Sequence, residues 1–449
     1  MGRSVDYSAV VVSTSGSQPL STAAYRLPLR RVIARPAELG TVALAALVGC
    51  AFVLAAGAAS RPSDFVPLSN EHFPSWMAGP LHGIGFVMPE GVLTALVVAI
   101  CLCYAVILWC AAGLGSRRVW CAIVLGHLAA LLAPPLLSSD VFGYIAFARL
   151  GVLHDLSPYV YGASAAPHDA ILPYIFWRNV TTPYGPLFTL LTYAIVPLGI
   201  AGGLWALKLL AALLSLATVA LVWQVAKRLG RSPTLAVAIY GLNPLVLVFA
   251  VAGAQNDTLV GMFVIAGVLW LVTSRERAGA VALVFAAALK ASAGLVLPFA
   301  LIGAARRRRT AVAMLAALAV VAIVAVAAFG TDLHGFLHAL LGEQREVSPR
   351  SLPSRVSRLL GLGRLAEVVR VAFLTLFALA LLAGLGRAWR GSWWLDCYAW
   401  VTLALLACTG WLLPWYGIWA LLPASLSQSR RLQTVTLLAC VYLLAIKIA

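Results

Sequence analysis

Long apolar runs recur along almost the whole of this chain. A helix needs about 20 mostly apolar residues to cross roughly 30 Å of bilayer hydrocarbon, and runs of that kind follow one another from residue 38 onward. Hydrophobic residues make up 62% of the sequence and charged residues 10%, which lies outside the range of soluble domains. Because lipid satisfies no backbone polar groups, each span has to be helical. The sequence therefore predicts an all-α polytopic integral membrane protein.

Basic residues gather in short clusters between the apolar runs. The clusters lie at residues 29–35, 116–118, 226–231, 274–277, 306–309, 387–390 and 429–431. Cytoplasmic loops carry an excess of Lys and Arg, so these clusters are predicted on the cytoplasmic side of the inner membrane, with residues 1–37 as a cytoplasmic tail. The net charge of +17 follows from this bias, and nucleic acid is not an expected partner.

The clusters divide residues 38–449, predicted as a single transmembrane domain, into separate spans. These fall near residues 38–59, 91–114, 119–137, 204–225, 233–252, 258–273, 310–330, 366–386, 394–412, 413–427 and 432–448. A full span at 184–203 would put the basic clusters at 116–118 and 226–231 on opposite sides of the membrane. A re-entrant or membrane-edge helix is therefore predicted there. Residues 278–305 lie between two cytoplasmic clusters and predict two short helices that turn near Lys290.

This topology leaves three sizeable outer loops, at residues 60–90, 138–183 and 331–365. Six of the seven histidines fall in them, together with most acidic residues outside the tail. Loops that merely join helices are usually much shorter. The outer face is therefore predicted to hold the polar chemistry, although solvated loop surface is the alternative for most of these residues.

Asp140 is the acidic residue with the most informative position. It follows the predicted span 119–137 and precedes the run VFGYIAFARLG, whose apolar spacing predicts an amphipathic interfacial helix. A carboxylate there meets water and lipid, where a general base is able to reach a polar acceptor while a second substrate comes from the bilayer. Helix N-capping, beside Ser138 or Ser139, is the alternative.

Three further stretches place polar groups beside apolar runs. TTPYGPLF (181–188) carries two prolines and a glycine that break a helix. VAGAQNDTLVGMF (251–263) puts Asn256 and Asp257 at the outer end of a span. Lys290 in AAALKASAGLVLP is an ionisable residue within an apolar hairpin, and such residues are candidates for functional sites. Its expected partner is an anion, either Asp257 or a lipid phosphate.

Five motifs in a fixed order resemble a known family. SSDVFGYIAFARLGVLHDLSPYVYG, TPYGPLF, GAQNDTLVGM, ALKASAGLVLP and LPWYGIWALLP are similar to segments of the polyprenol-phosphate-mannose-dependent α-1,6-mannosyltransferases of actinobacterial lipoglycan assembly, in the GT-C superfamily. The resemblance covers roughly residues 90–430. It implies a GT-C-like bundle, for which the apolar runs predict about 11–14 transmembrane helices, with amphipathic or re-entrant helices in the outer segment 138–203. It also implies that Asp140 is the catalytic base.

The remaining site residues are assigned by the chemistry that the resemblance implies. The donor phosphate needs fixed cations, and the candidates are Lys290, Arg345, Arg350 and Arg355. The candidates for binding sugar or acceptor are Tyr144, Tyr184, Asn256, Asp257, Trp415 and Tyr416. A rim of solvated charge is the favoured alternative for the loop arginines, and an interfacial aromatic belt explains the aromatic residues about equally well.

The expected function is transfer of a sugar, with mannose the first choice, from a polyprenyl-phosphate donor to a glycan or lipoglycan acceptor at the outer membrane face. The predicted mechanism is an inverting displacement in contact with membrane lipids. Arabinose, glucose and galactose are alternative sugars. A lipid or lipid-linked glycan transporter is the alternative function, although no internal repeat is visible. No cofactor or metal is expected, because HGFLH (334–338) lacks a carboxylate partner motif.

Overall fold

The computed structural model describes residues 26–60, 62–66, 73–84, 87–343 and 346–448. Within these ranges every regular element is a helix, which confirms the predicted all-α class. Residues 1–25 of the predicted cytoplasmic tail lie outside the described ranges. The rest of that tail belongs to the first helix, which begins at Arg26, earlier than the predicted span.

Six of the described helices are long and apolar enough to cross a membrane. They are α1 (Arg26–Ser60), α3 (Glu90–Cys110), α7 (Gly199–Arg228), α12 (Arg307–Phe329), α15 (Glu367–Trp389) and α18 (Arg430–Ile448). The helices α8 (Pro233–Gly241) and η6 (Val246–Ala252) are bent by 65° and form a seventh span if they are taken together. The protein is therefore a polytopic membrane protein, while the total of about 11–14 spans stays a prediction.

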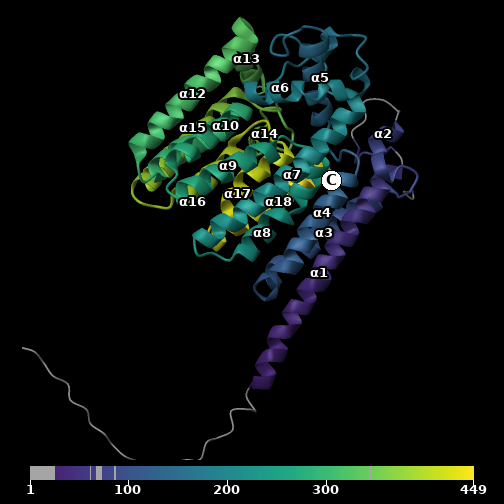
Figure 1. Ribbon diagram of the computed structural model, residues 1–449, viewed down its shortest axis with the longest axis vertical. Helices are drawn as coiled ribbons and strands as arrows, with labels where there is room; N and C mark the ends of the chain where they lie inside the picture. The colour runs from purple at the N-terminus through teal and green to yellow at the C-terminus, as the bar shows by residue number, and fades with distance from the viewer. Residues whose placement is uncertain (1–25, 61, 67–72, 85–86, 344–345, 449) are drawn as a thin grey trace, which may run out of the picture.

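Shorter helices fill the space between the long ones. They are α4 (Ser116–Leu132), α9 (Asp257–Val272), α10 (Glu276–Leu289), α11 (Val296–Gly303), α16 (Trp394–Cys408) and α17 (Gly417–Ser425). The helix α1 packs on α3 and α4, α9 lies between α7 and α10, and α10 also packs on α12 (Figure 1). At the C-terminal end α15, α16, α17 and α18 pack in sequence order.

Two predicted spans are shorter than expected. The helix α4 ends at Leu132 rather than near 137, because Pro134 and Pro135 follow and the residue before a proline avoids the helical region. The predicted span 413–427 is a 3₁₀ turn, η9 (Pro414–Tyr416), followed by the nine residues of α17. At 1.5 Å per residue such a helix covers only about 14 Å, which is too short to cross the membrane.

The prediction of two short helices around Lys290 is confirmed. The helix α10 ends at Leu289, and the 3₁₀ segment η7 (Ala291–Leu295) leads into α11. Lys290 itself has an extended backbone, with φ −152° and ψ 119°. The chain therefore changes direction at the only lysine of this segment, which places its side chain at a helix end instead of inside a span.

Several segments predicted as outer contain short helices, of which α5 (Asp140–Leu153), α6 (Pro186–Tyr193) and α13 (His334–Glu343) gather at one end of the bundle (Figure 1). Another of these short helices is α14 (Leu352–Leu359). The expected amphipathic pattern is not found in α5, because most of its side chains are buried against α6, α7 and the aromatic residues Trp76 and Tyr174. The eight residues of α6 are too few for a span, and α7 begins only at Gly199.

Candidate active site

Two adjoining cavities lie among α5, α6, α13 and the C-terminal helices. The first, about 340 Å³ and called here the lysine-side cavity, is lined by Asp140, Tyr184, Lys290, Trp411, Trp415, Tyr416 and Trp419, among others. The second, about 350 Å³ and called the loop-side cavity, is lined by Asp140, Tyr184, Asn179, Thr181, His338, Glu346 and Trp411, among others. Asp140 and Tyr184 border both cavities, so they lie where the two meet.

Asp140 is the first residue of α5, and Ser139 takes the N-cap position. The Ser139 side chain makes no capping hydrogen bond, while the Asp140 N–H donates to Ser138 Oγ over 3.3 Å. The carboxylate lies in the first helical turn, where the helix dipole favours negative charge. Asp140 is half-buried and therefore keeps access to both cavities, as a general base requires.

The surroundings of Asp140 make it a stronger base than an ordinary aspartate. Burial raises the pKa of its carboxyl from 3.8 to about 6, and nearby Asp257 acts in the same direction. Lys290 and Gln255 oppose the shift, because a cation and a hydrogen-bond donor both favour the charged carboxylate. A pKa near neutrality is the value at which a general base transfers protons most effectively.

Lys290 forms a buried ion pair with Asp257. Its Nζ lies 2.9 Å from Asp257 Oδ2 and 3.1 Å from Oδ1, and 3.4 Å from Asn256 Oδ1. Trp419 Nε1–H donates to Asp257 Oδ1. The Asp257 side chain is fully buried and that of Lys290 is 13% exposed, so the lysine is the partner that reaches the cavity. Asp257 and a lipid phosphate were the two predicted partners of Lys290, and Asp257 is the one that contacts it in the structure.

A local irregularity in the backbone places Asp257 at a helix start. The π-helix η6 ends at Ala252, and Ala254 then takes φ +52°, in the left-handed region that residues other than glycine rarely adopt. The chain turns there, and α9 begins at Asp257. Asp257 therefore lies in the first turn of α9, where a carboxylate is stabilised by the helix dipole.

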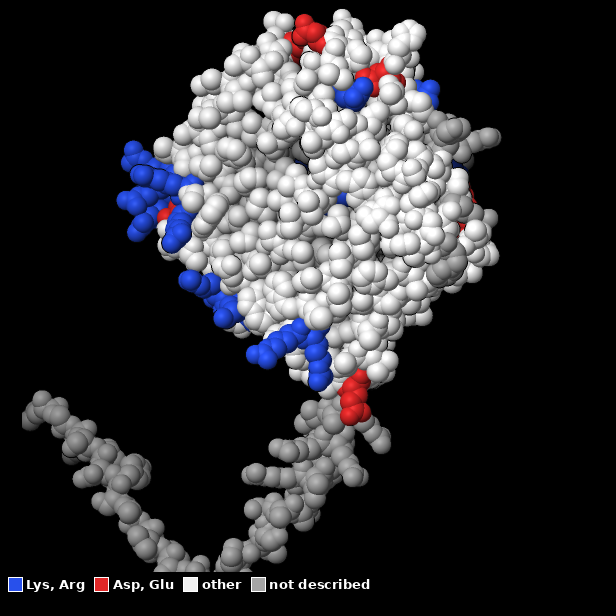
Figure 2. All heavy atoms as spheres, turned by 45° about the vertical axis from the view of Figure 1, so that its right-hand side comes forward, with Lys and Arg blue, Asp and Glu red and all other residues white. Residues whose placement is uncertain are grey.

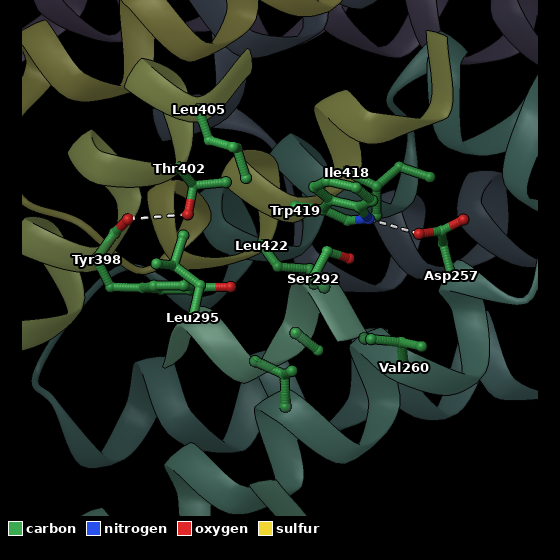
Figure 3. A pocket seen from close by; sticks show the side chains of 13 residues that line it. Asp257, Val260, Ser292, Leu295, Tyr398, Thr402, Leu405, Ile418, Trp419 and Leu422 are labelled. Atoms are coloured by element: carbon green, nitrogen blue, oxygen red, sulfur yellow. Dashed lines mark hydrogen bonds between the residues drawn. The ribbon is translucent and has the colours of Figure 1, made fainter. Parts of the chain in front are cut away.

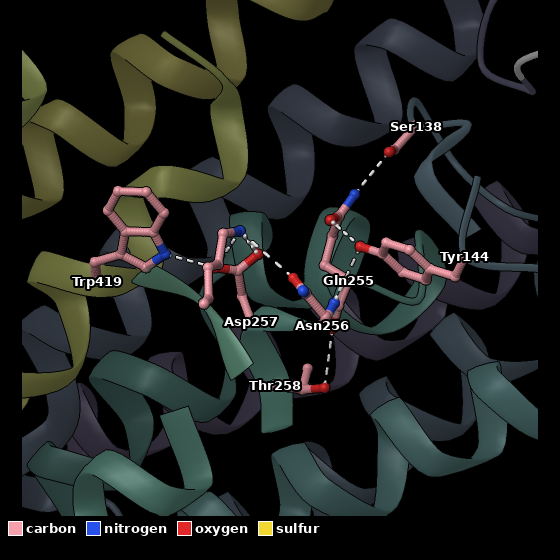
Figure 4. Close-up of polar contacts among 8 residues, drawn as sticks. Ser138, Tyr144, Gln255, Asn256, Asp257, Thr258 and Trp419 are labelled. Carbon is pink, nitrogen blue, oxygen red and sulfur yellow. Dashed lines mark hydrogen bonds and ion pairs between the residues drawn. The ribbon is translucent and has the colours of Figure 1, made fainter. Parts of the chain in front are cut away.

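Gln255 joins this turn to the start of α5 (Figure 4). Its Nε2 donates to Ser138 Oγ over 2.6 Å, and Tyr144 donates from its hydroxyl to Gln255 Oε1 over 3.0 Å. The Asn256 N–H in turn lies 3.3 Å from the Tyr144 oxygen. Tyr144 is only 1% exposed and supports this network rather than lining a cavity. The network holds the segments of Asp140 and Asp257 in one arrangement.

Aromatic rings cover the C-terminal wall of the lysine-side cavity. Tyr416 and Trp419 are stacked with 4.2 Å between ring centroids, and the Nζ of Lys290 lies 5.5 Å and 5.2 Å from the two centroids. A narrow apolar pocket continues past Trp419, between α9, α16 and α17 (Figure 3). The cavity thus offers a cation beside aromatic faces and apolar side chains.

Arg350 and Arg355, the two loop arginines within the described residues, do not line either cavity. The Arg350 guanidinium contacts the Ile446 carbonyl, and the Arg355 guanidinium lies 5.5 Å from the centroid of the Tyr442 ring. Both arginines are exposed and pack against α18. Arg345 lies outside the described residues. Of the three predicted phosphate-binding cations that the structure describes, only Lys290 lines a cavity with Asp140.

A second buried lysine was missed by the sequence reasoning. Lys208 in α7 is completely buried, and its Nζ donates to Ala130 O over 3.2 Å and to Ala252 O over 2.7 Å. These carbonyls lie near the ends of α4 and η6, where helix carbonyls lack their own partners. The available signal was a lysine within the apolar run of this 30-residue helix, far from the basic residues at its end.

Gln255 and Trp419 were also missed, although both lie inside motifs that were singled out. The contact between Gln255 and Ser138 joins residues 117 apart in the sequence, so no local pattern predicts it. In the part of the chain that the structure describes, no three His, Cys, Asp or Glu side chains gather as metal ligands. The expected absence of a metal stays a prediction.

Comparison with known proteins identifies the family. The sequence model of the family described as "Alpha-(1->6)-mannopyranosyltransferase, N-terminal domain" matches residues 37–306. The chain belongs to this family. The family match covers Asp140, Asp257 and Lys290, while the aromatic wall at 411–419 lies beyond it.

Two curated relatives carry the name Alpha-(1->6)-mannopyranosyltransferase A. The protein from Mycobacterium tuberculosis is 32% identical over 338 residues, which are 67% of this chain and 64% of the relative. The protein from Corynebacterium glutamicum is 30% identical over 192 residues, which are 42% of this chain and 38% of the relative. The chain thus spans less than two thirds of the length of either relative. No solved structure matches the chain.

Proposed function

We propose that the protein transfers a mannosyl group from a polyprenyl-phosphate donor to a glycan or lipoglycan acceptor at the extracytoplasmic face, with Asp140 as general base. The observation that carries the proposal is the position of Asp140 at the meeting point of two cavities of different character. A displacement reaction needs such a point, where the acceptor hydroxyl and the anomeric carbon of the donor come together. The family membership supports mannose as the sugar.

The lysine-side cavity suits the donor. A polyprenyl-phosphate sugar carries an anionic phosphate between an apolar chain and a sugar ring. Lys290 provides the cation for the phosphate, and Leu405 and Leu406 of α16 provide an apolar wall for the chain. Trp415 and Tyr416 offer ring faces to the sugar. Since Asp257 already neutralises part of the lysine charge, the phosphate binds to a shared cation and leaves readily after transfer.

The loop-side cavity suits the acceptor. Asn179, Thr181, His338 and Glu346 supply donors and acceptors of hydrogen bonds at its wall. Trp177 and Trp411 lie edge to face with 5.7 Å between centroids, and both border this cavity. Polar groups interspersed with flat aromatic faces are suited to saccharide hydroxyls and ring faces. The cavity is formed by outer loops, so a water-borne glycan reaches it directly.

The proposed reaction is a single inverting displacement. The ionised Asp140 carboxylate takes the proton of the acceptor hydroxyl while that oxygen forms a bond to the anomeric carbon of mannose. The bond from the anomeric carbon to the phosphate oxygen breaks, and its electron pair leaves with the polyprenyl phosphate. Lys290 stabilises the negative charge that develops on the phosphate. The products are the extended glycan, the free lipid phosphate and one proton held by Asp140.

The test is an assay of the purified full-length protein in lipid nanodiscs with labelled polyprenyl-phosphate mannose and a mannose-containing acceptor. We expect Asp140→Asn to lower turnover by about 10²- to 10⁴-fold, the contribution of a general base. Asp155→Asn is the matched control, because Asp155 is an exposed carboxylate in the same outer segment. The control should transfer mannose at the wild-type rate.

Several outcomes would overturn the proposal. Transfer by Asp140→Asn at more than about a third of the wild-type rate lies outside the range of a general base and would remove Asp140 from that role. Equal use of a nucleotide-linked mannose would exclude the lipid donor. Faster transfer of arabinose, glucose or galactose would change the sugar, and movement of labelled donor across the bilayer without product would favour a transporter.

A further inference from the structure

A surface groove runs between α10 and α12, and none of its lining residues borders the two cavities of the candidate active site. Its volume is about 710 Å³. The helix α10 contributes Arg277, Val281 and Phe285, which are spaced four residues apart and so lie on one face. The helix α12 contributes arginines at its start and then a stripe of valines and alanines. The groove is thus basic at one end and apolar along the rest of its length.

Small side chains keep the groove open. Ala313, Ala316 and Ala317 of α12 line it where larger residues would fill it, and Val312 and Val320 are 60% and 55% exposed. Only 22% of the apolar part of α12 is buried inside the protein. The helices α10 and α12 nevertheless pack side by side (Figure 1). An apolar groove of this kind beside a helix long enough to cross a membrane is shaped to take an acyl chain.

The basic end of the groove lacks an internal counter-ion. Arg277, Arg308 and Arg309 form no ion pair with a carboxylate within the described ranges. The neighbouring Glu276 is only 5% exposed. Both helices begin at this end, so their dipoles add to the positive potential. Figure 2 shows Lys and Arg gathered along one margin of the molecule, with little acidic surface among them.

We propose that this groove binds one anionic glycerophospholipid. The phosphate of the headgroup lies against Arg277, Arg308 and Arg309, because guanidinium groups bind phosphate oxygens in a bidentate manner. An acyl chain lies along Val281, Phe285 and Val312. Basic pockets between transmembrane helices bind anionic headgroups on the cytoplasmic side, and the predicted orientation puts these arginines there. The proposal is independent of the reaction proposed above.

The first experiment measures lipid retention by native mass spectrometry of the full-length protein in mild detergent. Phosphatidylglycerol and phosphatidylcholine with identical acyl chains are the probes. We expect the wild type to retain phosphatidylglycerol, and the triple variant R277Q/R308Q/R309Q to bind it on the order of 100-fold more weakly. The charge-matched control is R228Q/R430Q/R431Q, which removes three exposed arginines elsewhere on the predicted cytoplasmic side. Equal loss in both triple variants would overturn the proposal.

A second pair of variants tests the apolar part without changing charge. Ala316→Phe fills the groove, whereas Ala319→Phe adds the same ring to an exposed position of α12 that does not line it. We expect only Ala316→Phe to lose phosphatidylglycerol. Retention by both variants, or displacement of the lipid by glycerol phosphate at equal concentration, would show a phosphate site without a bound acyl chain and would sink the proposal. Equal retention of phosphatidylcholine would do the same.

Discussion

At the scale of single residues, the chemistry depends on charges that offset one another. Asp140 is half-buried and is made more basic by burial, while Lys290 limits that effect. Lys290 is itself held by Asp257 and Trp419. The cation therefore affects two things at once, the donor phosphate in our proposal and the protonation of the base. The two effects are separable by experiment.

We expect transfer activity to fall as pH falls through about 6, the pKa of Asp140. The base must be ionised to accept a proton, so activity is present above this pKa and lost below it. Lys290→Met removes a cation that lowers the pKa of Asp140. The loss of activity at low pH should therefore begin at a higher pH in this variant. Initial rates measured across the pH range test this, and an unchanged pH profile in Lys290→Met would contradict the coupling.

Lys290→Met should also weaken binding of the polyprenyl-phosphate donor. This variant leaves Asp257 buried without its cation, which typically costs about 3–5 kcal/mol of folding free energy. The double variant D257N/K290M removes both charges and should recover most of that stability but not the donor affinity. Donor binding by fluorescence titration and thermal unfolding, measured on both variants, distinguish the roles. Wild-type donor affinity in the stable double variant would make the ion pair purely structural.

At the scale of elements, close packing sets the position of Lys290. The Gly185 N–H donates to the Leu289 carbonyl over 3.0 Å. A Cβ on Gly185 would lie 2.0 Å from the Ala288 carbonyl oxygen, a contact that no side chain tolerates. The segment TTPYGPLF thus carries its glycine where the chain touches the end of α10, and Tyr184 beside it borders both cavities.

Gly185→Ala should push this segment away from the end of α10 and disturb Tyr184 and Lys290 together. We expect a loss of at least about tenfold in kcat/KM, because a displacement near 1 Å in a reacting geometry costs up to about 10²-fold. Gly199→Ala is an informative contrast, since a Cβ there meets no neighbour but the φ of +69° strains it. If Gly185→Ala were fully active, the contact would have no role in the site.

Lys208 holds the ends of α4 and η6 together through the carbonyls of Ala130 and Ala252. Ala252 lies three residues before Gln255 in the sequence. In Lys208→Met two carbonyls lose a donor, at about 1–3 kcal/mol each, but a buried charge worth about 2.5–3.5 kcal/mol is also removed. These terms nearly cancel. We therefore expect a small change in thermal unfolding and a clear fall in kcat, and Lys227→Met, an exposed lysine of the same helix, should change neither.

At the scale of the whole molecule, charge is distributed unevenly between the two ends. Figure 2 shows most basic side chains along the left and lower margins, with a few acidic atoms among them, while the upper end carries acidic groups with single basic side chains beside them. The outer segments with Asp140 lie at the end away from the start of α1 (Figure 1). The positive-inside bias then predicts that the two cavities face the outside.

A cysteine at Ser164 should react with a membrane-impermeant thiol reagent added to intact cells, and one at Ser232 should not. Both positions are exposed, Ser164 in the segment after α5 and Ser232 at the start of α8. The parent chain, whose native cysteines include exposed Cys121, measures the background labelling. Labelling of the Ser232 variant alone would reverse the orientation and place the cavities in the cytoplasm.

The sequence by itself determined the class of the protein and the segments that hold the site. Hydrocarbon imposes helices on every span, so apolar runs predicted the fold class. The turn at Lys290 followed from two basic clusters too close together for two ordinary spans. Asp140 and Lys290 were singled out because ionisable residues beside apolar runs are rare, and Tyr184 was singled out because an aromatic face suits a sugar; all three line the lysine-side cavity.

Only the tertiary structure decided which of these residues meet. The pair of Lys290 with Asp257 spans 33 residues and the contact of Gln255 with Ser138 spans 117, and such contacts depend on how whole helices pack. Packing also buried Tyr144 and turned Arg350 and Arg355 toward α18. The local sequence pattern indicates which side chains prefer the membrane boundary. Which residues of distant segments contact one another depends on how their helices pack.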